Sequence, residues 1–267
     1  MEAEAAKALG PTATGQVQSL TRALGLLEIL ADREGGLSLS ELSLAASLPR
    51  STTHRLMTTM EAMRFVRFER ERNRWVIGVQ TFTIGQAFAR SRDIGELAKP
   101  IAQTLMKELG ETINVAILED GHMRYVAQAA HVHGAETFAS PGQTAPFHAS
   151  AAGKSVLAYG PAKTAELYLK ASGPLQYTRR TMVALKDLMS DLQVTRARGY
   201  AIDDAERRAD VRCVAAPVFD ERGQPLGAFS VSTTCERLPE SRQAAVGARL
   251  RDAARILTVN IGGRWLQ

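Results

Sequence analysis

The sequence feature that most constrains the fold is a change of hydrophobic period near Arg64. Before that residue, apolar side chains recur at helical spacing in three segments, which we expect to form three helices. After it, apolar and polar residues alternate over residues 65–68 and 74–77, which is the pattern of two β-strands joined by a charged tip. Three helices followed by a β-hairpin predict a winged helix-turn-helix over residues 16–78.

The first helix is predicted over residues 17–31, because Gly35 and Gly36 then provide a stop signal. Ser40 is expected to cap the second helix, since a serine hydroxyl can accept a hydrogen bond from an unpaired backbone N–H at a helix start. The apolar stripe of the first helix, which we expect to face the core, consists of Leu20, Ala23, Leu24, Leu27 and Leu30.

The third helix follows a turn that Pro49 imposes, because proline prevents the second helix from continuing. We expect this helix to begin near Ser51, to be capped by Ser51 or Thr52, and to run to about Met63. Its inward stripe is expected to consist of Leu56, Met57, Met60 and Met63. Its outward face is expected to carry Ser51, Arg55 and Thr58, with His54 and Thr59 near the border.

This outward face has the residue types that a DNA-recognition helix uses. Hydroxyl side chains can hold phosphates, and arginine can bind guanine edges in the major groove. From Arg50 to Arg74, seven arginines stand against three glutamates, and such a positive excess favours DNA affinity. The candidate DNA-binding residues are Arg22, Arg50, Ser51, Thr52, Thr53, His54, Arg55, Arg72 and Arg74. From spacing alone, a small solvated helical bundle with a charged hairpin remains an alternative.

Composition fits an ordinary globular protein of two domains. The 267 residues are 45% hydrophobic and 23% charged, and the net charge of +5 favours a polyanionic partner. Residues 1–15 are rich in small residues and lack an apolar signal segment, so we expect a flexible arm. No stretch approaches the about 20 apolar residues of a membrane span. The two cysteines form no CxxC pair, which suits a reducing cytoplasm, and we expect no cofactor and no metal.

The second part of the chain predicts a different architecture. Residues 79–93 are expected to form a linker helix, and residues 94–265 are expected to form a second domain. In that domain, strands over residues 113–118, 123–127, 212–219 and 227–232 are joined in pairs by tight turns and flanked by helical segments. This pattern predicts an α/β (α+β) domain with a mainly antiparallel sheet.

Three motifs then occur in register. They are QSLTRALGLLEIL with LSLSELSLAASLPRSTTHRLMTTMEAMRFV, PGQTAPFHASAAGKSVLAY, and RGYAIDDAERRADVRCVAAPVFDERGQPLGAFSVS. Together they resemble the IclR (isocitrate lyase regulator) family of bacterial transcription regulators over roughly residues 16–260. The resemblance implies a winged helix-turn-helix, a linker helix and a GAF-like effector domain, and no enzyme activity. It also implies homodimers or dimers of dimers on operator double-stranded DNA.

The resemblance further implies a small-molecule pocket in the second domain. Matching the motifs assigns to it Ala145, Ala151, Ala152, Asp203, Cys213, Ser230 and Ser232. Ser230 and Ser232 alternate on one predicted strand, so their hydroxyls face the same side. Residues 149–153 are small and precede a predicted helix, which leaves backbone N–H groups for an anion. Because many family members sense small organic or aromatic acids, we expect such an effector, with Asp203 protonated or bound to a ligand hydroxyl.

Other chemistries are weaker interpretations of the same residues. The segment HASAAGKS ends like a P-loop but has His148 where GxxxxGK[ST] requires glycine. His131 and His133 share a predicted strand face and could bind zinc with His148. Cys213, Asp203 and a histidine could form a nucleophilic set. The resemblance favours a repressor, with an activator of a catabolic operon, or an enzyme whose helix-turn-helix mediates only protein contacts, as alternatives.

Overall fold

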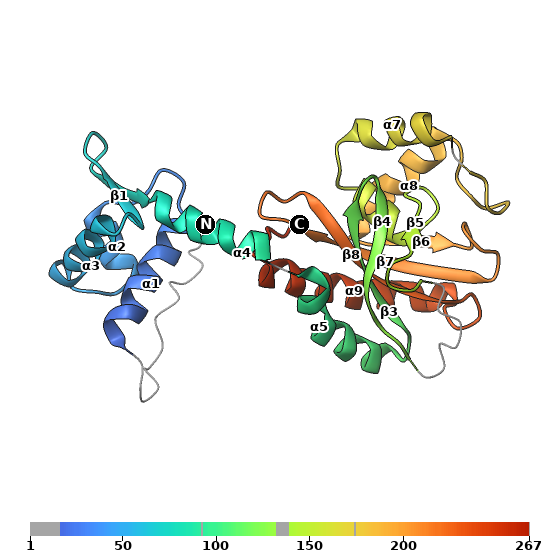
Figure 1. Ribbon diagram of the computed structural model, residues 1–267, viewed down its shortest axis with the longest axis horizontal. Coiled ribbons are helices and arrows are strands. Elements are labelled where there is room, and N and C mark those ends of the chain that lie inside the picture. Colours follow the sequence, from blue (N-terminus) through green and yellow to red (C-terminus); the bar gives the residue numbers. More distant parts are fainter. Residues whose placement is uncertain (1–16, 92, 132–138, 174, 267) are drawn as a thin grey trace. The chain divides into compact units, whose positions relative to one another are not determined.

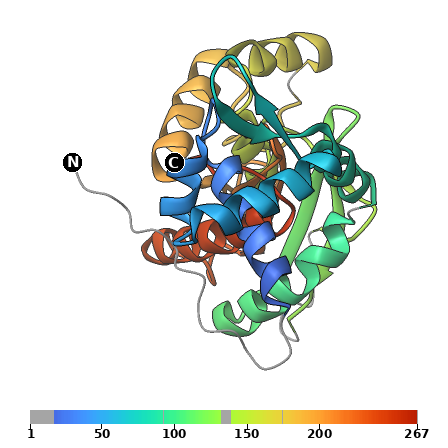
Figure 2. The same ribbon diagram turned by 90° about the vertical axis from the view of Figure 1, so that its left-hand side faces the viewer.

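The computed structural model describes residues 17–91, 93–131, 139–173 and 175–266. The chain divides into two compact units, Met1–Ser91 and Arg92–Gln267. The N-terminal unit consists of α1 (Gln18–Ala31), α2 (Leu39–Ala45), α3 (Arg50–Ala62), β1 (Val66–Glu69), β2 (Arg74–Ile77) and α4 (Val79–Ser91). Figure 2 faces this unit and shows the hairpin beside the helices. The predicted order of three helices and a two-stranded wing is confirmed.

The core of the N-terminal unit lies between α1, α2, α3 and the hairpin. It is formed by Leu26, Leu30, Leu42, Ala46, Met57, Met60, Val66 and Trp75. The predicted stripe of α1 is wrong in part, because Leu20 and Leu24 are 57% and 52% exposed. The segment LGLLEIL has apolar residues on several faces of the helix, so helical spacing alone could not single out Leu26 as the buried one. Met63 was also expected inside, but it follows the last residue of α3 and is exposed.

Both predicted helix caps in this unit require correction. Ser38, not Ser40, caps α2: its hydroxyl accepts from the Glu41 N–H at 3.3 Å, and the Ser38 N–H donates to the Glu41 carboxylate at 2.7 Å. This capping box needs an acid three residues after the serine, which Ser38 has and Ser40 lacks. At the start of α3, Pro49 occupies the cap position, and no side chain of Ser51 or Thr52 caps the helix.

The C-terminal unit is built on one antiparallel sheet with the strand order β5-β4-β3-β8-β7-β6. Its strands are β3 (Ile113–Glu119), β4 (His122–Ala129), β5 (Thr144–Ala145), β6 (Ala201–Asp204), β7 (Val211–Phe219) and β8 (Pro225–Thr234). Its helices are α5 (Ile94–Leu109), α6 (Ala151–Leu157), α7 (Ala162–Ser172), α8 (Leu185–Arg198) and α9 (Glu240–Asn260). The predicted antiparallel α+β architecture is therefore confirmed.

The two faces of this sheet have different cores. Helices α5 and α9 cover one face, where larger side chains such as Ile113, Phe229 and Leu250 pack (Figure 1). Helix α6 covers the other face, where alanines of the sheet, among them Ala215 and Ala228, let the helix approach closely. No helix in the described ranges is long and apolar enough to cross a membrane.

Candidate DNA interface and ligand cavity

Helix α3 presents most of its predicted DNA-binding side chains on one exposed face. Arg50, Ser51, His54 and Arg55 are exposed, and Thr52 is half-buried. Towards the end of the helix, the Thr59 hydroxyl donates to the Arg55 backbone carbonyl at 2.8 Å and is thereby occupied within the helix, whereas Arg55 itself is exposed. The arrangement combines positive charge and hydroxyl groups near a helix N-terminus, as major-groove readers require.

Thr53 does not belong to this face. Its side chain is fully buried, and its hydroxyl donates to the Pro49 carbonyl at 3.2 Å. The position falls on the inner side of α3, one turn before Met57, which is also fully buried. Thr53 therefore stabilises the start of the helix from within, and we remove it from the candidate interface.

The hairpin adds a charged tip to the same unit. Glu69 forms ion pairs with Arg67 at 2.6 Å and with Arg72 at 3.8 Å, while both arginine side chains stay largely exposed. Arg70 is exposed at the turn, and sequence reasoning did not select it although it lies in the same arginine-rich run. Exposed ion pairs of this kind contribute little to stability, so the arginines remain available to phosphates.

Arg74 is placed differently from the other wing arginines. Its guanidinium donates to the Gly36 carbonyl at 2.7 Å and lies 3.5 Å from a Glu41 carboxylate oxygen. Glu41 also belongs to the α2 capping box, and hydrogen bonds from the Ser38 backbone and side chain hold the pKa of its carboxyl below the ordinary value. Arg74 thus braces β2 against the start of α2. Arg22, predicted on the first helix, is half-buried on α1.

The C-terminal unit contains a cavity of about 280 Å³ beside the first turn of α6. It is lined by Tyr125, Gln143, Ser150, Ala151, Ala152, Asp203, Arg207, Arg208, Val211, Cys213, Ser230 and Ser232. Six of the seven predicted pocket residues are among them. Ala145 is not: it lies on the two-residue strand β5, opposite Met123, and is 1% exposed. The backbone around Ala145 is close to the cavity, but its methyl group packs into the core.

Strand register brings the polar members of the cavity together. Asp203 pairs with Cys213 across β6 and β7, and Cys213 pairs with Ser232 across β7 and β8. Ser230 lies two residues from Ser232, so it points to the same face, where it is opposite Asn114 of β3. Four polar side chains from three strands therefore face one space, although more than twenty residues separate Asp203 from Ser230 in sequence.

The hydroxyl of Ser230 is the best indication that this space binds something. Ser232 accepts from the Cys213 thiol at 3.3 Å and from the Asn114 amide at 3.4 Å. Ser230 is 2% exposed, yet its hydroxyl has no hydrogen-bond partner among the described residues. A buried hydroxyl without a partner costs about 1–3 kcal/mol, so a ligand oxygen at this position would relieve a real penalty.

Burial controls the charge of the acidic wall. Asp203 is 2% exposed, and burial raises the pKa of its carboxyl from 3.8 to about 6, although the Glu206 N–H, 2.7 Å away, and Lys154 oppose the shift. Burial of Cys213 raises the pKa of its thiol above the ordinary range, and the nearby charge of Asp203 adds to the shift. A protonated thiol is a poor nucleophile, and no histidine is among the cavity residues that the structure describes, so the nucleophilic interpretation is not supported.

Sequence reasoning missed several members of the cavity. Arg207 and Arg208 bring positive charge to its rim, and Tyr125 and Gln143 contribute polar groups from the β4–β5 side. The two arginines lie in the third sequence motif, shortly after Asp203. This adjacent pair of positive charges could have identified them as cavity residues. Tyr125 was detectable only through its place in the sheet, and burial raises the pKa of its hydroxyl above the ordinary range.

The P-loop and metal interpretations do not fit the described residues. Lys154 is fully buried and paired with carboxylates rather than exposed to a phosphate. His148 is buried, and one ring nitrogen lies 3.0 Å from the Leu175 carbonyl. His133 lies outside the described residues, and within them no cluster of three metal-ligating side chains occurs.

Comparisons with known proteins identify the family of the chain. Residues 19–70 match the IclR helix-turn-helix domain family, and residues 86–259 match the family described as bacterial transcriptional regulator IclR C-terminal. The chain is 42% identical over 253 residues to transcriptional repressor IclR of Escherichia coli (strain K12), covering 94% of this chain and 92% of that protein. It is 34% identical over 254 residues to the HTH-type transcriptional repressor AllR of the same strain, covering 94% and 93%.

Solved structures agree on the fold. The repressor BlcR of Agobacterium tumefaciens has a TM-score of 0.78 at 24% identity, covering 94% of this chain and all of that chain. IclR of Thermotoga maritima has a TM-score of 0.62 at 25% identity, covering 91% and 98%. At the identity of the first, the likeness supports the architecture alone.

Proposed function

Because the chain belongs to the IclR family of DNA-binding transcription regulators, we propose that it is a repressor whose operator affinity responds to a small organic acid, carboxylic or aromatic, bound in the cavity. The family is one of transcription regulators and not of enzymes. The repressor assignment is supported by the relatives named as repressors, and an activator of a catabolic operon is the alternative. The observation that carries the ligand proposal is the buried hydroxyl of Ser230, which has no hydrogen-bond partner in the part of the chain that the structure describes.

The chemistry of the cavity supports a small acid. A volume of about 280 Å³ lies at the lower end of ligand pockets, which favours a small ligand. Arg207 and Arg208 at the rim are suited to a carboxylate, and Ser230 can donate to one of its oxygens. Asp203, with its raised pKa, can stay protonated in mildly acidic solution or accept from a ligand hydroxyl. We therefore propose Ala151, Ala152, Asp203, Cys213, Ser230 and Ser232 as effector-contacting residues, with Ala145 as a supporting one.

For the DNA interface, we propose direct contacts by the exposed face of α3 and by the wing tip. Arg55 reads base edges, and Arg50, Ser51, Thr52 and His54 contact the backbone or neighbouring bases, with Arg22 and Arg72 adding phosphate contacts. In this proposal residues 16–78 bind DNA, residues 79–93 form the link, and residues 94–265 bind the effector. Arg74 acts by holding the wing in place through Gly36 and Glu41.

We also propose that the chain acts as a homodimer, or as a dimer of dimers, in the cytoplasm. Leu20 and Leu24 on α1 and Phe82 and Ile84 on α4 are large apolar side chains that are each more than half exposed. Exposed apolar side chains in such number within one small unit indicate a protein contact. A second copy of the chain fits best, because operator half-sites are read by paired helix-turn-helix units.

The experiment is an anisotropy titration of a duplex selected in vitro from a randomised pool by the full chain. We expect Arg55→Ala to weaken binding to that duplex by about 1–3 kcal/mol at fixed salt, and to leave affinity for a scrambled duplex nearly unchanged. Arg179→Ala removes the same charge from an exposed position of the C-terminal unit and serves as the control. Unchanged specific binding by Arg55→Ala would count against α3 as the reading helix.

A further inference from the structure

The charged wall of the cavity is carried by one tight turn after β6. Within it, the Glu206 N–H donates to the Asp203 carboxylate at 2.7 Å, and the Asp204 N–H donates to the Glu206 carboxylate at 3.3 Å. Ala205 between them has φ of 59°, a left-handed conformation that is costly for a residue with a Cβ. A turn of this kind keeps its shape only where its surroundings hold it.

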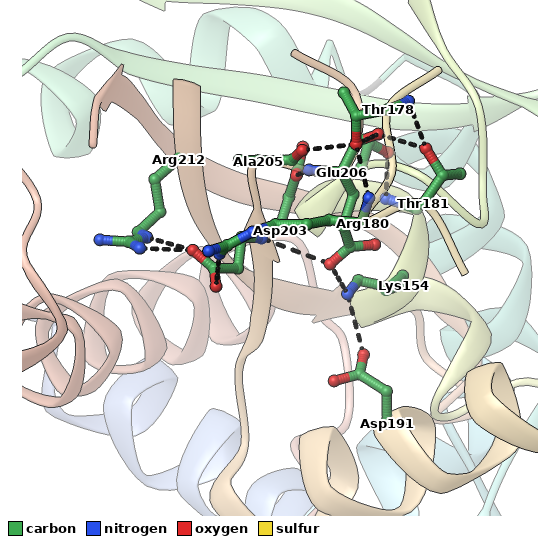
Figure 3. Close-up of polar contacts among 12 residues, drawn as sticks. Lys154, Thr178, Arg180, Thr181, Asp191, Asp203, Ala205, Glu206 and Arg212 are labelled. Carbon is green, nitrogen blue, oxygen red and sulfur yellow. Dashed lines mark hydrogen bonds and ion pairs between the residues drawn. The ribbon is translucent and has the colours of Figure 1, made fainter. Parts of the chain in front are cut away.

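A buried lysine holds the turn from the inside. Lys154 of α6 is fully buried, and its Nζ lies 2.5 Å from Glu206 Oε1 and 2.9 Å from Asp191 Oδ2 of α8 (Figure 3). Burial alone would lower the pKa of Lys154, but the two carboxylates together raise it, so the lysine is charged. Burial raises the pKa of Glu206 to about 7 against the opposing effect of Lys154.

Hydroxyl groups of the segment before α8 hold the backbone of the same turn. Thr178 donates to the Ala205 carbonyl at 2.8 Å, and Thr181 donates to the Glu206 carbonyl at 2.6 Å. Arg180 from the same segment pairs with Asp204 at 2.5 Å. Figure 3 shows Thr178 and Thr181 on one side of Glu206, and Lys154 and Asp191 on the other. None of them is among the described residues that line the cavity.

The position of Lys154 in α6 connects two walls of the cavity. Ala151 and Ala152, which line the cavity, lie less than one helical turn before Lys154. Asp203 and Arg207, which line the opposite side, flank Glu206 in the turn. The Lys154–Glu206 ion pair therefore spans from the helix wall to the charged wall behind the cavity surface.

We propose that Lys154 and Glu206 are positioning residues for the effector: their buried ion pair holds the turn over residues 203–208 against α6, and so sets how Asp203 and Arg207 face the ligand. This rests on the proposed function of the cavity. A buried ion pair is a weak source of net stability, because desolvation offsets the attraction. Its proposed role is geometric. The two charged groups fix the distance between α6 and the turn, which form two walls of the cavity.

The test uses Cys213 as a reporter inside the cavity. The chain has two cysteines, so Cys235→Ser leaves Cys213 as the single thiol. Alkylation by iodoacetamide, in which the sulfur displaces iodide, is timed at a temperature well below melting for the parent, Lys154→Met, and the pair Lys154→Met with Glu206→Gln. Lys170→Met, which breaks the exposed ion pair with Glu166 on α7, is the matched control.

Lys154→Met is expected to lower the melting temperature, because Glu206 is left buried without its partner, and the paired substitution is expected to restore most of the loss, since Asp191, which also loses Lys154, is 18% exposed to solvent. Glu206→Gln alone, timed in the same way, removes the same charge near the thiol but keeps an amide oxygen for Lys154, and relative to it Cys213 of the paired variant is expected to react about fivefold faster or more, because the wall is no longer held in place. A purely structural ion pair predicts that the paired variant reacts at the same rate as Glu206→Gln alone once the melting temperature has recovered, and that result would overturn the proposal. Lys170→Met should change neither quantity.

A second variant keeps the test decisive if the buried substitutions do not fold. Thr181→Val removes the hydroxyl that donates to the Glu206 carbonyl and leaves both charges of the ion pair in place. It is expected to accelerate alkylation in the same direction by about twofold or more. A parental rate in this variant, measured with an intact fold, would contradict the role of the turn.

A separate measurement shows whether the cavity binds small acids, as the proposed function requires. Iodoacetate is itself a small carboxylate, so a cavity selective for acids should raise its rate at Cys213 relative to iodoacetamide, compared with the same ratio for a free peptide thiol. An equal ratio in the parent would argue against a carboxylate effector. The comparison of iodoacetamide rates among the variants would still decide whether Lys154 and Glu206 position the turn.

Discussion

Replacing Asp203 with asparagine removes the one carboxylate among the described residues that line the cavity, while an amide oxygen can still accept from the Glu206 N–H. Burial raises the pKa of this carboxyl in the folded chain from 3.8 to about 6. Between these two values the folded state keeps a proton that the unfolded state has lost. The associated stability is complete below about pH 4 and is lost as the pH rises through about 6, so the parent should weaken with increasing pH.

The size of this effect follows from the same two pKa values. One pKa unit corresponds to about 1.4 kcal/mol, so full ionisation of the buried Asp203 costs about 3 kcal/mol. About half of that loss has occurred by pH 5, because the unfolded carboxyl is already ionised there. Between pH 5 and pH 8, the free energy of unfolding of the parent should therefore fall by about 1.4 kcal/mol relative to Asp203→Asn.

The assay is urea unfolding at pH 5 and pH 8, followed by the fluorescence of Trp265. Trp265 packs against Phe219 with ring centroids 5.3 Å apart, so it reports on the C-terminal unit. A Trp75→Phe background removes the signal of the N-terminal unit. Glu206, whose pKa of about 7 is raised in part by the charge of Asp203, is less perturbed in the variant, so its contribution adds to the predicted difference in the same direction. If parent and variant differ by the same free energy at both pH values, the electrostatic description of Asp203 is refuted.

Two further predictions concern the N-terminal unit. Ser38→Ala should lower the free energy of unfolding of this unit by about 1 kcal/mol, because it removes the capping box. The assay is urea unfolding followed by Trp75 fluorescence. Ser40→Ala is the control, and an equal loss there would contradict the cap assignment. Phe82→Ser should weaken self-association about tenfold or more in sedimentation equilibrium, because it removes an exposed apolar anchor. Leu167→Ser, at an equally exposed position on α7, should leave association unchanged, and a loss of similar size there would argue against the α1 and α4 faces.

Local patterns in the sequence predict most elements of the fold. The hairpin and the helix from Val79 follow from hydrophobic period and turn residues, which act over a few positions. Details that depend on tertiary packing cannot be predicted from these local patterns. Leu24 and Leu26 are both leucines on an apolar helix, and only the tertiary contacts of α1 decide that Leu26 is buried and Leu24 exposed. The α2 cap was available to sequence reasoning through the Ser38 and Glu41 spacing.

The cavity was predicted through family resemblance rather than through physical pattern. Ser230 and Ser232 share a face by strand alternation, but their meeting with Asp203 depends on the register of β6, β7 and β8, which the sequence does not specify locally. The Lys154–Glu206 pair was beyond prediction for a related reason. A charged lysine in AAGKS is ordinarily expected at the surface, and its complete burial follows only from carboxylates brought by two distant segments.

In the proposed function, ligand occupancy of the cavity changes the affinity of the chain for operator DNA. A panel of small organic acids is first screened for the acid that raises the melting temperature of the protein most. The direct measurement is then an anisotropy titration of the selected operator duplex by the full chain at fixed salt, without this acid and with a saturating concentration of it. We predict that operator affinity falls by a factor of about 5–150, the usual range of coupling between two sites. Operator affinity that stays unchanged while the acid is bound would contradict the account.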